Sequence, residues 1–161
     1  MNATSAGKPP DSYKWIALSN TTLGVLAAAM NSSILLISLP AVFRGIHLDP
    51  LQPGNINFLL WTIMGYMVAT SVLVVAVGRL GDGFGRARMY NLGFAIFTAA
   101  SIALSLMPGS GSFATIYLIV VRIIQGIGGA FLMANAVAIL TDAFPPDQRG
   151  LAMGINTMAA I

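Results

Sequence analysis

Long apolar stretches without charge alternate with short polar breaks along most of this chain. Residues 15–43, 58–78 and 89–107 contain no Asp, Glu, Lys or Arg. A fourth stretch, 113–140, is interrupted only by Arg122, and a fifth runs from 151 to 161. A membrane-spanning helix needs about 20 mostly apolar residues. The pattern therefore predicts four complete transmembrane helices and the start of a fifth.

The residue types in these stretches favour helices over strands. Strands of membrane barrels are short and alternate strictly between apolar and polar positions, whereas these stretches are long and rich in Leu, Ala, Ile and Met. Proline and glycine gather in the breaks between them, as expected of loops. We expect an all-α membrane protein, with residues 1–14 as a cytoplasmic tail and residues 15–161 as an incomplete transmembrane bundle.

Composition supports a membrane protein and makes an enzyme a poor expectation. Hydrophobic residues make up 57% of the chain and charged residues 8%, and the mean hydropathy is +0.82, values that do not suit a soluble domain. The chain has no cysteine and a single histidine, His47, so we expect no metal site. The glycines at 78–85 lack the order of a nucleotide-binding loop, and we expect no cofactor.

The distribution of Lys and Arg predicts the orientation, because short loops rich in these residues stay in the cytoplasm. A cytoplasmic N-terminus leaves only Arg44 in an outer loop and places one group of basic residues inside: Lys8, Lys14, Arg79, Arg86, Arg88 and Arg149. The net charge of +3 then follows from membrane topology and does not indicate nucleic-acid binding. We expect a multi-pass protein of the cell membrane.

Topology alone does not explain the stretch GRLGDGFGRARMY at 78–90, which lies between the second and third apolar stretches. Its glycines allow a tight reversal of the chain, and Asp82 can pair with a neighbouring arginine such as Arg86. We predict that this stretch is a cytoplasmic loop that acts as a conformational latch, with Gly78, Asp82, Gly85 and Arg86 as its main residues.

The spacing G-x-L-x-D-x-x-G-R in this stretch resembles the motif between the second and third helices of the major facilitator superfamily. The segment RIIQGIGGA at 122–130 is similar to the family's fourth-helix motif. The segment MNSSILLISLPAV at 30–42 is similar to the first-helix signature of the family's drug and proton antiporter branch. The resemblance covers nearly all of the chain after its N-terminal tail. The sequence departs from the family's usual pattern at Gly83 and Ala87, where basic residues are frequent. We therefore expect fewer ion pairs in this stretch than is typical of the family.

This resemblance implies the N-terminal portion of a transporter for proton-coupled efflux of small organic molecules or drugs, inactive by itself. Its partners would be the lipid bilayer, a small-molecule substrate, protons and the missing C-terminal helices. The alternative is a small four-span membrane protein, or a truncated helix-association module, that transports nothing. A reading frame continuing beyond Ile161 would discriminate between the two.

Arg122, Asn31 and Gln125 are the candidate residues of the substrate or proton pathway. A charge inside a membrane costs at least about 2.5 kcal/mol on insertion scales and normally faces a cavity or a partner. On helical wheels, Arg122 shares a sector with Gly126, with Gln125 at its edge, while Asn31 lies on a stripe of small and polar residues that includes Asn20 and Gly24. The antiporter branch often has an acid near Asn31, and asparagine cannot bind a proton in its place.

Overall fold

A computed structural model describes residues 11–45, 47, 55–107, 109 and 111–160, and these form an all-helical bundle. In chain order its helices are α1 (Asp11–Gly45), α2 (Ile56–Phe84), α3 (Arg86–Ser105), α4 (Ser112–Ala143) and α5 (Arg149–Met158). The expected all-α fold is confirmed. Helices α1 to α4 are each long and apolar enough to cross a membrane, and α5, with 10 residues, is much shorter.

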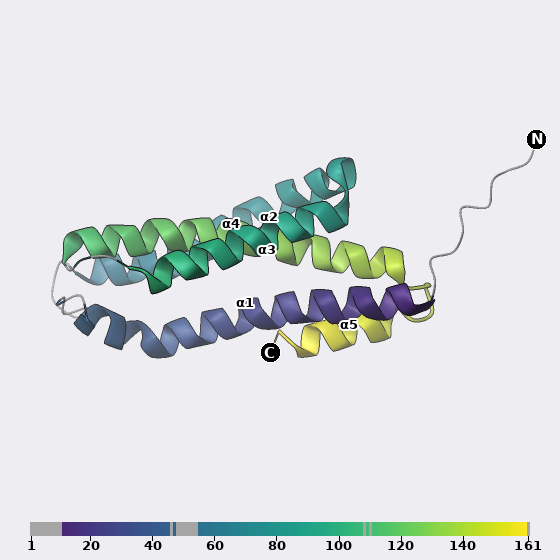
Figure 1. The fold of residues 1–161 in the computed structure, drawn as a ribbon, viewed down its shortest axis with the longest axis horizontal. Coiled ribbons are helices and arrows are strands. Elements are labelled where there is room, and N and C mark those ends of the chain that lie inside the picture. The colour runs from purple at the N-terminus through teal and green to yellow at the C-terminus, as the bar shows by residue number, and fades with distance from the viewer. Residues whose placement is uncertain (1–10, 46, 48–54, 108, 110, 161) are drawn as a thin grey trace, which may run out of the picture.

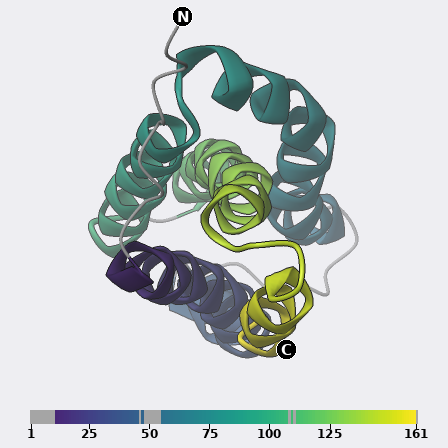
Figure 2. The same cartoon turned by 90° about the vertical axis from the view of Figure 1, so that its right-hand side faces the viewer.

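Helix α4 lies at the centre of the bundle, with α1, α2 and α3 around it (Figures 1 and 2). The glycines of α4 explain why the backbones of α2 and α3 approach it so closely. A Cβ atom added at Gly126 would lie 2.7 Å from the backbone oxygen of Tyr66 on α2, and one added at Gly128 would lie 2.7 Å from the backbone nitrogen of Phe97 on α3. Real Cβ atoms do not approach other atoms so closely, and small residues are the usual means by which membrane helices pack backbone to backbone.

Helix α1 packs along the bundle and includes residues 11–14 of the predicted tail. The helix begins at Asp11, so residues 11–14 are helical, while 1–10 lie outside the described residues. Near its start, the Lys14 ammonium donates a hydrogen bond to Gln148 Oε1 at 3.4 Å, next to α5. At its far end, Leu39 and Phe43 pack against Leu118 of α4.

The stretch between α2 and α3 is a correction to the predicted loop. Helix α2 continues through Gly78 and Asp82 to Phe84, and α3 begins at Arg86. Gly85 is the one residue between them, with φ of 96°, a conformation that side-chain-bearing residues rarely adopt. The reversal therefore needs a single glycine, and the preceding glycines belong to the last turns of α2.

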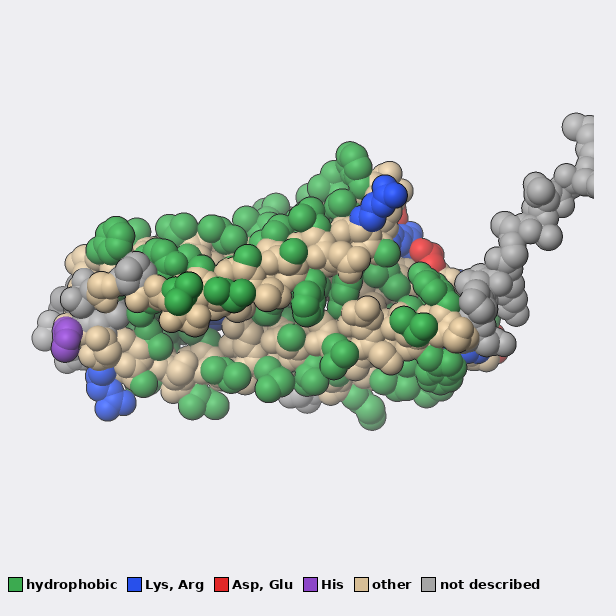
Figure 3. Space-filling model, viewed as in Figure 1, with side chains coloured by type: hydrophobic (Ala, Val, Ile, Leu, Met, Phe, Trp, Pro, Cys, Tyr) green, Lys and Arg blue, Asp and Glu red, His purple; other side chains and the backbone are tan. Residues whose placement is uncertain are grey.

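The surface of the bundle has the distribution expected of a membrane protein. Hydrophobic side chains cover the length of the face in Figure 3, and the charged side chains visible on it gather near the two ends. Exposed apolar residues occur on all four long helices, including Leu23, Val72, Phe94 and Ile116. Such surface suits contact with lipid or with further helices.

Candidate functional site

Arg122 lies in the first half of α4 and is almost completely buried, with 2% of its surface exposed. Its Nη1 donates a hydrogen bond to Oε1 of Gln125, three residues further along the same helix. The guanidinium also stacks on the ring of Tyr66 from α2, with Cζ 5.1 Å from the ring centroid. This position combines a full positive charge with neutral neighbours, a cation–π contact among them.

Gln125 is the centre of a polar cluster that joins three helices. Its Nε2 donates to Oδ1 of Asn31 on α1 at 3.2 Å and to the Ser101 hydroxyl on α3 at 2.8 Å. Its Oε1 accepts from Nδ2 of Asn31 at 3.4 Å and from Arg122. All the hydrogen-bonding capacity of this buried amide is thereby used, which fixes its orientation and that of its neighbours.

The three residues singled out from the sequence as a pathway are thus brought together. Two members of the cluster, Ser101 and Tyr66, were not assigned to it by sequence reasoning. Each was a polar group within an apolar stretch, a signal shared by many serines and threonines whose hydroxyls bond their own helix, such as Thr21 and Thr62. Tertiary contacts, not spacing, distinguish the members.

A cavity of about 270 Å³ adjoins the cluster between α1, α3 and α4. Its polar lining residues are Asn31, Ser38, Ser101, Ser105, Arg122 and Gln125. The rest of its wall is apolar and includes Leu35, Leu104 and Leu118. A few convergent polar groups in a mostly apolar cavity are typical of sites for small organic molecules.

The polar stripe predicted on α1 does not face this cavity along its whole length. The Tyr90 hydroxyl of α3 donates to the backbone oxygen of Asn20 at 2.9 Å, and a Cβ atom at Gly24 would collide with the same hydroxyl. This half of the stripe is a helix-packing contact, because Gly24 has no side chain and so leaves room for the Tyr90 ring. Asn31 lines the cavity, as does Ser38, seven residues further along α1.

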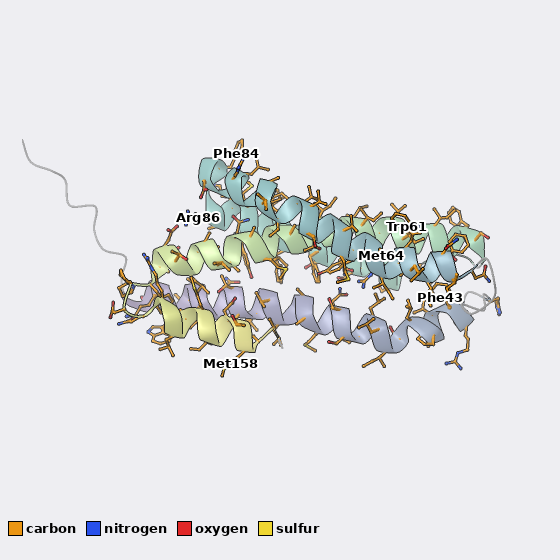
Figure 4. The ribbon with its side chains drawn as sticks, turned by 180° about the vertical axis from the view of Figure 1, so that it is seen from behind. Phe43, Trp61, Met64, Phe84, Arg86 and Met158 are labelled. Atoms are coloured by element: carbon orange, nitrogen blue, oxygen red, sulfur yellow. The ribbon has the colours of Figure 1, made fainter. Side chains whose placement is uncertain are left out.

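A second cluster lies at the end of the bundle where α2 meets α3, and Arg86 is its centre. Its Nη2 is 2.8 Å from Asp82 Oδ1, and its Nη1 is 2.8 Å from Asp142 Oδ1 near the end of α4. Nη1 also donates to the backbone oxygen of Ala138 at 3.0 Å. Figure 4 shows Arg86 beside Phe84 at this end of the bundle, with Phe43 at the opposite end. One guanidinium therefore connects α2, α3 and α4.

Sequence reasoning found the Asp82 and Arg86 pair but missed Asp142, because 56 positions separate Asp142 from Arg86 and no local spacing relates them. Gly85 supplies the turn that places Arg86 at the start of α3. Gly78 is not part of the cluster: it lies within α2, and no atom would meet a Cβ added there within 4 Å.

The described residues contain no group of His, Cys, Asp and Glu that could hold a metal ion. The arrangement resembles a binding site for a small molecule more than a site of covalent chemistry. Its distinctive features are a buried cation, a fixed amide pair and an adjoining cavity.

Comparison with known proteins shows the family of this chain. Residues 21–161 match the sequence profile of the Major Facilitator Superfamily. The chain is 34% identical over 143 residues to the riboflavin transporter RibZ of Clostridioides difficile, covering 89% of this chain and 29% of that protein. It is 33% identical over 141 residues to the tetracenomycin C resistance and export protein of Streptomyces glaucescens, covering 88% and 24% of the two chains.

A third relative, multidrug resistance protein 3 of Bacillus subtilis, is 30% identical over 155 residues, which cover 96% of this chain and 27% of that protein. The chain thus spans about a quarter to a third of the length of these curated relatives. No solved structure matches it.

Proposed function

This chain belongs to the Major Facilitator Superfamily, a family of transporters rather than enzymes, and on that premise we propose that it works as the N-terminal part of a proton-coupled exporter of small organic molecules. The buried cluster of Arg122, Gln125 and Asn31 beside a cavity is the observation that carries this proposal. The names of two relatives, an export protein and a multidrug resistance protein, favour export.

We assign Arg122, Gln125 and Asn31 to the pathway of substrate or protons. Asn31 and Gln125 lie near the middle of their helices, and Arg122 lies one helical turn from Gln125. Transporters built from paired bundles bind substrate near the midplane of the membrane, between the bundles. Asn31 cannot take up a proton, so the carboxylate that couples transport to protons lies in another part of the complete protein. The positive charge of Arg122 acts on whatever anionic group enters this region.

We assign the cluster of Asp82, Arg86 and Asp142 to conformational gating. Its two ion pairs hold α2 and α4 to the first residue of α3. The side chains are partly exposed, with 32% exposure for Arg86 and more than 60% for each aspartate. Exposed ion pairs contribute only about 0–1 kcal/mol to stability, so they can break and re-form during a transport cycle.

We place the N-terminus and the gating cluster on the cytoplasmic side of the cell membrane. The contact of Lys14 with Gln148 and the contact of Arg86 with Asp142 tie the start of α1 and the junction of α2 and α3 to the same end of α4. These elements also carry Arg79, Arg88 and Arg149, so positive charge is concentrated at this end, as expected of a cytoplasmic face.

The test uses the complete transporter in proteoliposomes with an imposed pH gradient, and measures uptake of a fluorescent organic dye. The Arg122→Ala variant is expected to abolish gradient-driven uptake, and Arg122→Lys to retain part of it if charge alone is needed and little if the planar fork is needed. The Asn31→Asp variant adds a titratable group and is expected to make uptake more dependent on pH.

The matched control is Arg44→Ala. This variant removes one exposed positive charge from the last turn of α1 and should leave uptake unchanged. Unchanged pH profiles in all three site variants at equal expression would place Arg122 and Asn31 in structural packing. Absence of any gradient-driven uptake by the unmodified protein, across a panel of dyes, would contradict the proposed function itself.

A further inference from the structure

The charge of Arg122 has no counter-ion in the part of the chain that the structure describes. Its contacts are the amide oxygen of Gln125 and the face of the Tyr66 ring, both neutral. Its buried Nε has no hydrogen-bond partner among the described residues. Asp82, on α2, and Asp142, near the far end of α4, pair with Arg86 instead.

The amide of Gln125, which already contacts Arg122, cannot supply the missing partner. Gln125 already accepts two hydrogen bonds at Oε1 and donates two from Nε2, so it has no acceptor left. A guanidinium has five N–H donors, and a buried donor without an acceptor costs about 1–3 kcal/mol, more when it is charged. The site therefore favours an acceptor that carries negative charge.

The lining of the adjoining cavity indicates which kind of ligand can carry the negative charge. Arg122 and the amides of Asn31 and Gln125 contribute to its wall, and apolar side chains such as Leu35, Leu104 and Leu118 line much of the remainder. A planar carboxylate matches the fork of the guanidinium with two parallel hydrogen bonds. An apolar body attached to it would contact the leucines, and a cationic group there would meet uncompensated like charge in a setting of low dielectric.

We infer that the cavity beside Arg122 selects small amphipathic organic anions, with the carboxylate of the ligand paired to the guanidinium and its apolar body against the leucine-lined wall. This inference rests on the proposed transport function and names the substrate class of the same site. It assigns Arg122 to substrate recognition. The negative charge that pairs with Arg122 is then supplied by the bound ligand.

The experiment measures equilibrium binding to the complete protein in nanodiscs, with three probes of nearly equal size and shape: phenylbutyrate, phenylbutyramide and phenylbutylamine. They present an anionic, a neutral and a cationic head on the same apolar body. The expected result is that phenylbutyrate binds at least about 10-fold more tightly than either other probe, as a charge-assisted pair predicts.

Variants then locate the selectivity. Arg122→Gln should bring the affinities for phenylbutyrate and phenylbutyramide to within about twofold, and Arg122→Lys should leave an intermediate preference because the charge remains but the fork is lost. Arg44→Gln is the matched control: it removes one arginine charge from the exposed end of α1 and should keep the full preference.

The three probes are also compared on the unmodified protein. This comparison can refute the inference even if a substituted protein folds poorly. Equal binding of the three probes, or a carboxylate preference that survives Arg122→Gln, would overturn the inference. Tighter binding of phenylbutylamine would also overturn it and would indicate that a carboxylate of the protein itself neutralises Arg122. Gradient-driven dye uptake is measured in parallel, so a transporter that lacks anion selectivity is distinguished from a protein that does not transport.

Discussion

At the scale of single residues, the two arginine clusters differ in how strongly their surroundings hold them. Arg122 is 2% exposed and surrounded by neutral groups, whereas Arg86 is partly exposed and bridges two aspartates. Loss of a partner is therefore costly at the first site and cheap at the second. The first suits a fixed binding site, and the second suits a contact that opens and closes.

The Asp82→Asn substitution tests the second role. It removes one of the two ion pairs of Arg86, and we expect dye uptake by the complete protein to fall severalfold. The expected loss of unfolding free energy is below about 1 kcal/mol, because the pair is exposed. Uptake into proteoliposomes and thermal unfolding in detergent measure the two effects separately.

Asp147→Asn provides the control, since Asp147 is an exposed aspartate in the turn between α4 and α5, at the same end of the bundle. It should leave uptake unaltered. Normal uptake by well-expressed Asp82→Asn protein would reduce the gating cluster to a determinant of membrane topology.

At the scale of helices, the glycines of α4 decide how closely the bundle packs. Gly128 contacts the backbone of α3 and Gly126 that of α2, so α4 can occupy the centre without side chains at these crossings. This close packing holds the part of α4 that carries Arg122 and Gln125, and so maintains the geometry of the candidate pathway.

The Gly128→Ala variant should destabilise the bundle by about 1–3 kcal/mol, as expected for overpacking, because its Cβ would lie 2.7 Å from the backbone nitrogen of Phe97 and 3.0 Å from the backbone oxygen of Gly93. Thermal unfolding of the complete protein in detergent measures the change. Gly78→Ala is the control: Gly78 is also helical but has open space at the Cβ position. Equal midpoints for the two variants would refute tight packing at Gly128.

At the scale of the whole molecule, the described helices supply one side of the proposed transport pathway. The described helices build a cavity of about 270 Å³ from one bundle, and alternating access in this kind of fold moves one bundle against another around a central site. The chain spans 29% and 24% of the length of two curated relatives. We therefore expect transport to need more of the protein than these residues.

The corresponding prediction is that residues 1–161, purified and placed in liposomes, show no proton-driven dye flux above that of empty liposomes. The complete protein under identical conditions is the positive control. Saturable flux from the 161-residue chain would contradict the prediction and would require several copies to form the pathway together.

The sequence by itself determined the class of protein, the number of long helices and the segments long and apolar enough to span a membrane. Hydrophobic length decides these features, and it is a local property that adjacent residues share. The same local reasoning placed Asp82 beside Arg86, because a tight reversal of the chain at the glycines keeps these neighbouring residues close. It failed at the junction of α2 and α3, where repeated glycines indicated a loop but only Gly85 leaves the helix.

Tertiary structure alone decided which polar groups meet. Gln125 and Asn31 are 94 positions apart, and Arg86 and Asp142 are 56 apart, so no spacing rule relates them. The same holds for Ser101 and Tyr66, which join the cluster only because α3 and α2 pack against the glycines of α4. Helix periodicity gives the face of each helix, but the rotation and approach of neighbouring helices depend on side-chain packing along their whole length, and this packing sets the geometry of the site.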